Sequence, residues 1–119
     1  IYYENKSGER PVEEFINNLN AKIKAKLLAR IQYFEEHWHE LRRPYVDLVE
    51  DGIYELRVQF AKNKIRVIYA YMFKDYIVLL HSFIKTTGEI SENDKLIAKK
   101  RMYDFQIQHN EGRLKLKNI

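Results

Sequence analysis

The sequence predicts an α+β fold, with one small antiparallel sheet, helices packed on one face of it, and the order β-α-α-β-β-β-α. Two observations support this fold class. Apolar residues recur at helical spacing over residues 11–38 and again after residue 91. Between these stretches, three closely spaced runs have the pattern of strands in an antiparallel meander. With 119 residues, we expect a single domain over residues 1–108 and a mobile C-terminal tail at 109–119.

Two helices are predicted in the first third of the chain, after a short strand at Ile1-Tyr2-Tyr3. Pro11 suits the first turn of the first helix, where its missing N–H costs nothing. Asn20 can cap the second helix. That helix carries an apolar stripe made of Ile23, Leu27, Ile31, Phe34 and Trp38. We therefore expect two antiparallel helices joined by a tight turn.

The middle of the chain contains the strand signals. Residues 41–50 are interpreted as a connector, because Pro44 interrupts any helix. Apolar and polar residues alternate over 53–60 and again in the following run. Residues 76–84 are nearly all apolar, as expected for a strand buried on both faces. Ser91 is then the predicted N-cap of a last helix.

The strand alternation points to a candidate site. If the apolar residues of 53–60 face the helices, Arg57 and Arg66 on neighbouring strands point to the opposite face. In the register that we favour for the third strand, His81, Phe83 and Lys85 point the same way. Two lysines of the adjoining loop complete the candidate set, which is Arg57, Arg66, His81 and Lys85 with Lys62, Lys64 and Phe83 beside them.

Cations interleaved with an aromatic ring suit single-stranded nucleic acid, because phosphates bind the cations and bases stack on the ring. A solvated sheet face, on which basic residues only keep the strands soluble, is an equally good interpretation. The net charge is +4, with 8 basic and 10 acidic side chains in residues 1–52 but 13 and 7 in residues 53–119. A polyanionic partner is therefore expected on the second half. The one acid on this face, Glu55, is expected to pair with Arg57 or Arg66.

Several chemistries are excluded or disfavoured. The absence of Cys excludes disulfides, thiol catalysis and iron–sulfur clusters. His37 and His39 point apart on a helix and have no third ligand nearby, so we predict no metal site and no cofactor. His81 stays open between a satisfied structural histidine and a general base. Without an export signal or Cys, a cytoplasmic location is expected.

Four segments carry a further pattern: Gly-Ile-Tyr-Glu-Leu-Arg at 52–57, Ile-Arg-Val-Ile-Tyr at 65–69, Ile-Val-Leu-Leu-His-Ser-Phe-Ile-Lys-Thr-Thr at 77–87, and Ala-Lys-Lys-Arg with Asp-Phe at 98–105. In this order and spacing they resemble the RelE/ParE toxin superfamily, and in particular the HigB-type, phage-derived toxins of bacterial type II toxin–antitoxin systems. The resemblance covers about residues 1–108 and agrees with the predicted order of elements.

The resemblance implies a metal-independent endoribonuclease that cuts messenger RNA, usually on the translating ribosome, and so inhibits translation. In that reaction the RNA 2′-hydroxyl attacks the adjacent phosphate, so protons must move and extra negative charge must be stabilised. The resemblance assigns catalytic or phosphate-binding roles to Arg57, Arg66 and Lys85, and a base-stacking role to Phe83. It also implies a cognate antitoxin, expected to be a helix-turn-helix protein, in a hetero-oligomer with the toxin.

Two alternatives stay open. ParE-like members of the same fold inhibit gyrase and lack nuclease residues, so a non-catalytic toxin that binds a protein is one of them. The other is a phage-derived RNA-binding regulator without toxicity. The sequence also departs from the related branch after the third strand. It reads Lys-Thr-Thr-Gly-Glu at 85–89, with one lysine fewer and one acid more, which reduces the positive charge at the rim of the site.

Overall fold

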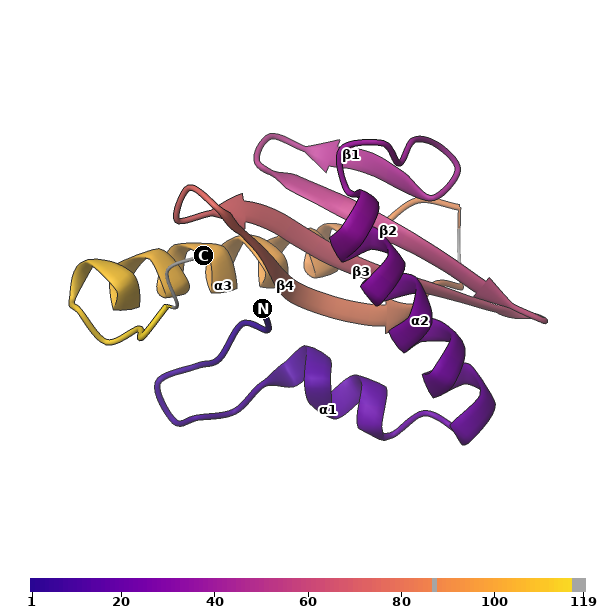
Figure 1. Cartoon of the computed structure of the whole chain (residues 1–119), viewed down its shortest axis with the longest axis horizontal. Coiled ribbons are helices and arrows are strands. Elements are labelled where there is room, and N and C mark those ends of the chain that lie inside the picture. The colour runs from indigo at the N-terminus through magenta and orange to yellow at the C-terminus, as the bar shows by residue number, and fades with distance from the viewer. Residues whose placement is uncertain (87, 117–119) are drawn as a thin grey trace.

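The computed structural model describes residues 1–86 and 88–116. Its elements are α1 (Pro11–Asn17), α2 (Ala21–His37), β1 (Val46–Glu50), β2 (Ile53–Phe60), β3 (Asn63–Met72), β4 (Tyr76–Ile84) and α3 (Glu92–Asn110). The strands form one sheet in the order β1-β2-β3-β4, and every neighbouring pair is antiparallel (Figure 1). The predicted α+β class and the antiparallel meander are confirmed.

The helices begin where the sequence predicts. Pro11 occupies the first turn of α1. The side-chain oxygen of Asn20 accepts a hydrogen bond from the backbone N–H of Ile23 at 3.0 Å, and Ser91 Oγ accepts one from Asp94 N–H at 3.0 Å. Each such cap stabilises its helix by about 1 kcal/mol. None of the helices in the described part of the chain is long and apolar enough to cross a membrane.

The predicted connector at residues 41–50 contains an additional strand. β1 pairs along β2, with Val46 opposite Leu56 and Asp47 opposite Glu55. The prediction of a connector was therefore wrong for residues 46–50. The strand is only five residues long and begins two residues after Pro44, so loop signals hide its short alternation.

The N-terminal residues make less of a strand than expected. Tyr2 forms a single parallel bridge with Leu79 on β4. The N–H of Tyr3 donates to the carbonyl of Leu79 at 2.9 Å, and the N–H of Leu79 donates to the carbonyl of Ile1 at 2.8 Å. These bonds fasten the chain start to β4, which would otherwise be a fully open edge.

A first hydrophobic core lies between the sheet and the helices α1 and α2. Its buried members are Val12, Ile16, Ile23, Leu27 and Phe34 from the helices, with Leu56, Val58, Ile65, Val67, Tyr69 and Leu79 from the strands. The side of β2 that the alternation assigned to the helices is the side that packs here. The expected helix pair is therefore the cover of this face.

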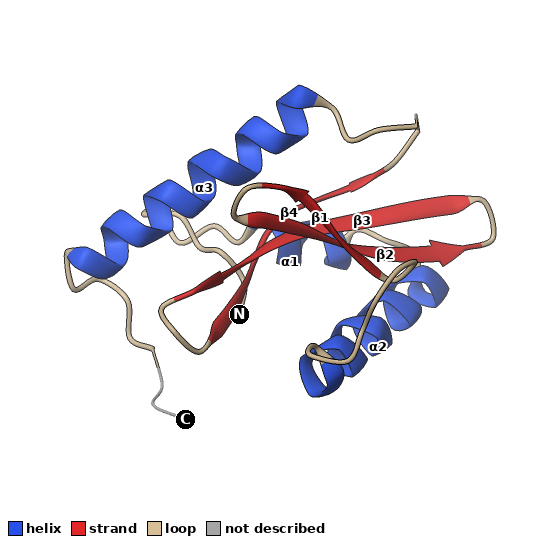
Figure 2. Ribbon diagram, turned by 90° about the horizontal axis from the view of Figure 1, so that it is seen from above, coloured by secondary structure: helices blue, strands red, loops and turns tan. Residues whose placement is uncertain are grey.

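A second core on the opposite face corrects the prediction that all helices pack on one face. α3 contributes Ala98 and Phe105, which pack with Tyr3, Ile53, Ile68, Ala70, Met72, Val78 and Leu80. Figure 2 shows α3 and α2 on opposite sides of the strands. The physical reason is the apolar character of β3 and β4 on both sides, which requires a cover on each face.

Helix α3 and its contacts continue past residue 108, where the sequence predicts the end of the domain. α3 continues to Asn110, and the N–H of Arg113 donates to the carbonyl of Gln108 at 2.9 Å. Leu114 packs against the second core. The rest of the predicted tail, at residues 117–119, lies outside the described residues.

The packing of α3 on the second face predicts how substitutions in this helix change the free energy of unfolding. Phe105→Ala removes a ring that is 3% exposed, and we expect it to lower the free energy of unfolding by about 3–5 kcal/mol. Leu96→Ala on the same helix, where the side chain is 49% exposed, is expected to change it by no more than about 0.5 kcal/mol. Urea denaturation of both variants is the measurement, and similar effects at the two positions would contradict the packing of α3.

Candidate functional site

The strand register brings the predicted basic residues to one face of the sheet. Arg57 on β2 lies opposite Arg66 on β3, and Arg66 lies opposite Phe83 on β4. One row further, the backbone N–H of Lys85 donates to the carbonyl of Lys64 at 2.7 Å. Directly paired residues of an antiparallel sheet point to the same side. We call Arg57, Lys64, Arg66 and Lys85 the basic cluster, and it lies on the face opposite α1 and α2.

Glu55 lies among these cations and is nearly completely buried. Its carboxylate is ion-paired with Nε of Arg57, and its Oε1 lies 3.7 Å from Nε of Arg66. The predicted salt bridge of Glu55 is therefore confirmed, and it involves both arginines. A buried carboxylate needs such partners, because an unpaired charge away from water is costly.

Asp47 on β1 is a second acid of this site, and the sequence pattern did not reveal it. Its Oδ2 lies 3.2 Å from Nη2 of Arg57, and its Oδ1 lies 3.0 Å from Nε of Arg43. Burial raises the pKa of Asp47, but the hydrogen bonds from Arg43 and from the N–H of Leu48 outweigh this and hold the pKa below its usual range. Asp47 lies beside Glu55 because β1 pairs with β2. The sequence predicted an irregular connector here, and the residues of a connector cannot be assigned to a face of the sheet.

The alternation predicted that Arg66 points into solvent. In the structure only 8% of its surface is exposed. It lies on the central strand β3, between Arg57 and Phe83 on the flanking strands. Its Nη1 donates to the carbonyl of Ile65 at 3.1 Å, whereas its Nε is buried without a hydrogen-bond partner in the described residues. Burial lowers the pKa of Arg66, yet a guanidinium remains protonated in proteins. The site therefore holds a cation with too few acceptors.

Lys85 adds a partly buried ammonium group at the end of β4. Burial lowers its pKa, and the charges of Arg66, Arg57 and Lys64 lower it further, while Glu55 opposes the shift. An anion bound among these groups would relieve their mutual repulsion. Residue 87 of the predicted rim lies outside the described residues.

His81 is hydrogen-bonded through both ring nitrogens. Its Nε2 lies 2.7 Å from Oδ1 of Asp94, and its Nδ1 lies 3.3 Å from Nη1 of Arg101, which also donates to the carbonyl of Leu80 at 2.9 Å. Burial lowers the pKa of His81, the hydrogen bond with Asp94 raises it, and Arg101 lowers it, so that the net shift is downward. A neutral ring that donates to Asp94 and accepts from Arg101 fits this geometry, which is that of a satisfied histidine joining β4 to α3.

The two remaining residues of the candidate set lie at the margin of the cluster. Lys62 is exposed in the turn between β2 and β3. Phe83 is half-buried against the second core, with its ring centroid 5.4 Å from that of His81. It therefore offers only part of its ring to a stacking base.

No three His, Asp or Glu side chains gather around a common point within residues 1–86 and 88–116, as a metal ion would require. His37 and His39 each have a local contact instead. Nδ1 of His37 lies 3.1 Å from the carbonyl of Tyr33, and Nε2 of His39 lies 3.6 Å from Oε1 of Glu40. The groups that the described residues bring together on this face of the sheet are mainly cations.

Comparison with known proteins gives one family. Residues 14–103 match the family described as "Phage derived protein Gp49-like (DUF891)". The match runs from α1 into α3 and includes the whole sheet and the basic cluster. The comparison with curated proteins found no match.

The His81 contacts predict a pH dependence of stability. The unfolded chain binds a proton at His81 near pH 6.5, whereas the folded protein, with its lowered pKa, resists protonation. The contribution of His81 to the free energy of unfolding is therefore fully present above about pH 6.5. It is lost as the pH falls through the lower pKa that His81 has in the folded protein. Thermal unfolding measured between about pH 7.5 and 5 should show this loss, and His81→Gln should reduce it. The exposed His39→Gln serves as the control, and an identical pH profile in both variants would contradict the assignment.

Proposed function

The chain belongs to the Gp49-like family of phage-derived proteins, a RelE-like toxin family, and on this basis we propose that it is the toxin of a toxin–antitoxin system that cuts messenger RNA. The observation that carries the proposal is the basic cluster, in which Arg66 is nearly buried and its Nε has no hydrogen-bond partner among the described residues, although Glu55 lies 3.7 Å away. The oxygens of an RNA phosphate are the acceptors that such a guanidinium lacks.

We assign the following roles in a cleavage that needs no metal. The RNA 2′-hydroxyl attacks the adjacent phosphorus and loses its proton to water, and the bond to the leaving 5′-oxygen breaks, which leaves a 2′,3′-cyclic phosphate. Arg57 and Arg66 bind the phosphate and stabilise the charge that develops on its oxygens. Lys85, whose pKa is lowered mainly by burial, protonates the leaving oxygen.

The cluster has no free general base in the described residues, which supports a requirement for the ribosome. Glu55 is occupied by two arginines, and both ring nitrogens of His81 have partners. We therefore assign His81 a positioning role, in which it fixes β4 against α3. The translating ribosome would hold the message in a reactive geometry and complete the site. This activity implies a cytoplasmic location.

The same charges define the partner that would silence the toxin. Four cations against two carboxylates leave the cluster positive, so an antitoxin with an acidic segment would neutralise it and exclude RNA. A helix-turn-helix antitoxin in a hetero-oligomer with this chain fits the proposal. No contact in the described part of the chain favours a gyrase-binding toxin or a non-toxic regulator.

The assignment predicts the effect of removing single cations. Arg66→Ala is expected to abolish growth arrest on induction, and Lys85→Gln to slow message cleavage about 100-fold, because each removes a charge at the reacting phosphate. Lys74→Gln, in the exposed turn between β3 and β4, is the charge-matched control and should leave both unchanged. Mapping of the 5′ ends of cellular messages and growth curves are the measurements, with circular dichroism to show that each variant folds.

Two outcomes would contradict this proposal. If folded Arg66→Ala still cut messages on ribosomes, the site would be misassigned. If the wild-type chain arrested growth without any new 5′ ends, a non-catalytic toxin that binds a protein would replace the nuclease.

The cluster also predicts the salt dependence of RNA binding. Each phosphate contact to single-stranded RNA contributes about −0.7 to the slope of log K against log salt. Lys85→Gln should therefore make that slope shallower by about 0.7, whereas Lys74→Gln should not change it. Fluorescence anisotropy of a labelled RNA at several salt concentrations gives the slopes, and equal slopes for the two variants would remove Lys85 from the interface.

A further inference from the structure

A groove of about 660 Å³ lies between the end of α2 and the sheet, beside β1. Its walls are mainly aromatic and apolar, and two arginines also line it. The residues used below are Trp38, Leu48, Tyr54 and Tyr71 from the walls, with Arg42 and Arg43 from the loop before β1. A volume of this size accommodates a small organic group such as a nucleotide.

The aromatic walls of the groove face solvent. Trp38 is 47% exposed and Tyr71 is 44% exposed, with ring centroids 5.6 Å apart. Tyr54 supports Tyr71 edge-on at 5.2 Å, and Leu48 beside them is 56% exposed. So much apolar surface gathered in one hollow marks a binding site more often than it marks ordinary surface.

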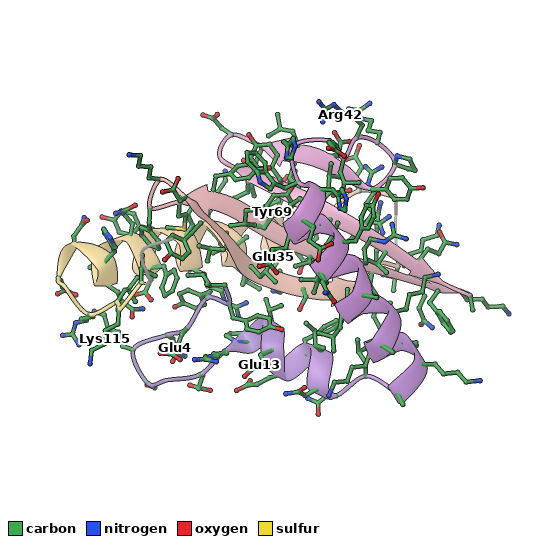
Figure 3. All side chains as sticks on the ribbon, viewed as in Figure 1. Glu4, Glu13, Glu35, Arg42, Tyr69 and Lys115 are labelled. Atoms are coloured by element: carbon green, nitrogen blue, oxygen red, sulfur yellow. The ribbon has the colours of Figure 1, made fainter. Side chains whose placement is uncertain are left out.

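Arg42 supplies a cation that has no carboxylate partner in the described residues. Its Nη1 donates to the carbonyls of His39 and Leu41 at 3.1 and 2.9 Å, which anchor the guanidinium to its own loop. Figure 3 shows Arg42 on the loop that joins α2 to β1, at the periphery of the molecule. The lining of the groove therefore carries a positive charge that no carboxylate of the described residues neutralises.

The groove is continuous with the basic cluster around the edge of the sheet. Arg43 lines the groove and lies 3.0 Å from Asp47, which in turn lies 3.2 Å from Arg57. Asp47 itself also lines the groove. A polyanion bound on the cluster can thus pass over β1 and reach the groove by way of Arg57 and Arg43, which lie on either side of Asp47.

We propose that this groove is a second subsite for single-stranded RNA, in which an unpaired base stacks on Trp38 and Tyr71 while Arg42 binds the neighbouring phosphate. The inference rests on the proposed function, because the same strand occupies the basic cluster. An aromatic ring and an anion recognised together are characteristic of single-stranded nucleic acid. An acidic peptide with an aromatic side chain has similar chemistry, but the continuity with the basic cluster favours RNA.

Trp38 is the only tryptophan of the chain, so its fluorescence reports directly on the groove. A short single-stranded RNA is expected to quench it, because a stacked base quenches indole emission. The same sequence as a duplex, and inorganic polyphosphate, should bind by charge without quenching. Unchanged Trp38 emission at RNA concentrations that saturate anisotropy-detected binding would overturn the proposal.

Variants test the same subsite without relying on emission. Trp38→Leu and Arg42→Gln are each expected to weaken RNA binding about tenfold, the effect of losing one stacked base or one phosphate contact. Matched controls are Tyr33→Leu, at a ring that is 49% exposed on α2, and Lys22→Gln at the opposite end of that helix. Neither control residue lines the groove, and both should leave binding unchanged. Equal affinities for all four variants would refute the subsite.

The outcomes separate this inference from the proposed function. RNA that binds with quenching, but is not cut even on translating ribosomes, supports the subsite and rejects the nuclease. RNA that is cut and whose binding depends on Arg66, but that does not quench Trp38, rejects the subsite alone. Absence of RNA binding by the wild-type protein rejects the subsite, whether or not the protein cuts messages on ribosomes. Quenching by an acidic, phenylalanine-containing peptide but not by RNA assigns the groove to a protein partner and also overturns the proposal.

Discussion

The buried carboxylate of Glu55 is the constraint on which the proposed RNA-binding face depends. Arg57 and Arg66 lie directly opposite each other on adjacent strands, where like charges repel. Glu55 contacts both and offsets that repulsion, and its burial strengthens the attraction because little water screens it. Asp47 then binds the outer side of Arg57. Two guanidiniums are thus held in place while the cluster as a whole stays positive, as the binding of a phosphate requires.

The second cover of the sheet determines where this cluster can lie. The cluster and α3 share the sheet face opposite α1 and α2. α3 packs on the part of that face that contains Ile53, Ile68 and Ala70, and the cluster occupies the part near the hairpin between β2 and β3. The contacts of His81 with Asp94 and Arg101 fasten α3 to β4 between these two parts. One face of the sheet therefore contributes to the second core and carries the cluster that we propose to bind RNA, whereas the face under α1 and α2 combines the first core with the groove at the end of α2.

β1 connects the two binding surfaces that we propose. Asp47 links Arg57 of the cluster to Arg43 at the groove, and Val46 and Leu48 of the same strand line the groove. An extended strand of RNA that crosses β1 would meet phosphate-binding groups first and stacking groups next. A small domain gains affinity in this way by using several weak contacts along one strand rather than one deep pocket.

Local patterns were sufficient to predict the helix starts at Asn20 and Ser91, and the shared face of Arg57 and Arg66. Capping involves residues three apart, and strand alternation is a property of the backbone, so neither needs knowledge of distant segments. Only the tertiary structure determined that α3 covers the second face, that Arg66 is buried, and that the strand containing Asp47 lies against β2. By its spacing Trp38 belonged to a core stripe, yet it lies just past the end of α2 and lines the groove. These features depend on burial and on charge pairs between segments far apart in the chain, and no local pattern encodes which distant segments will meet.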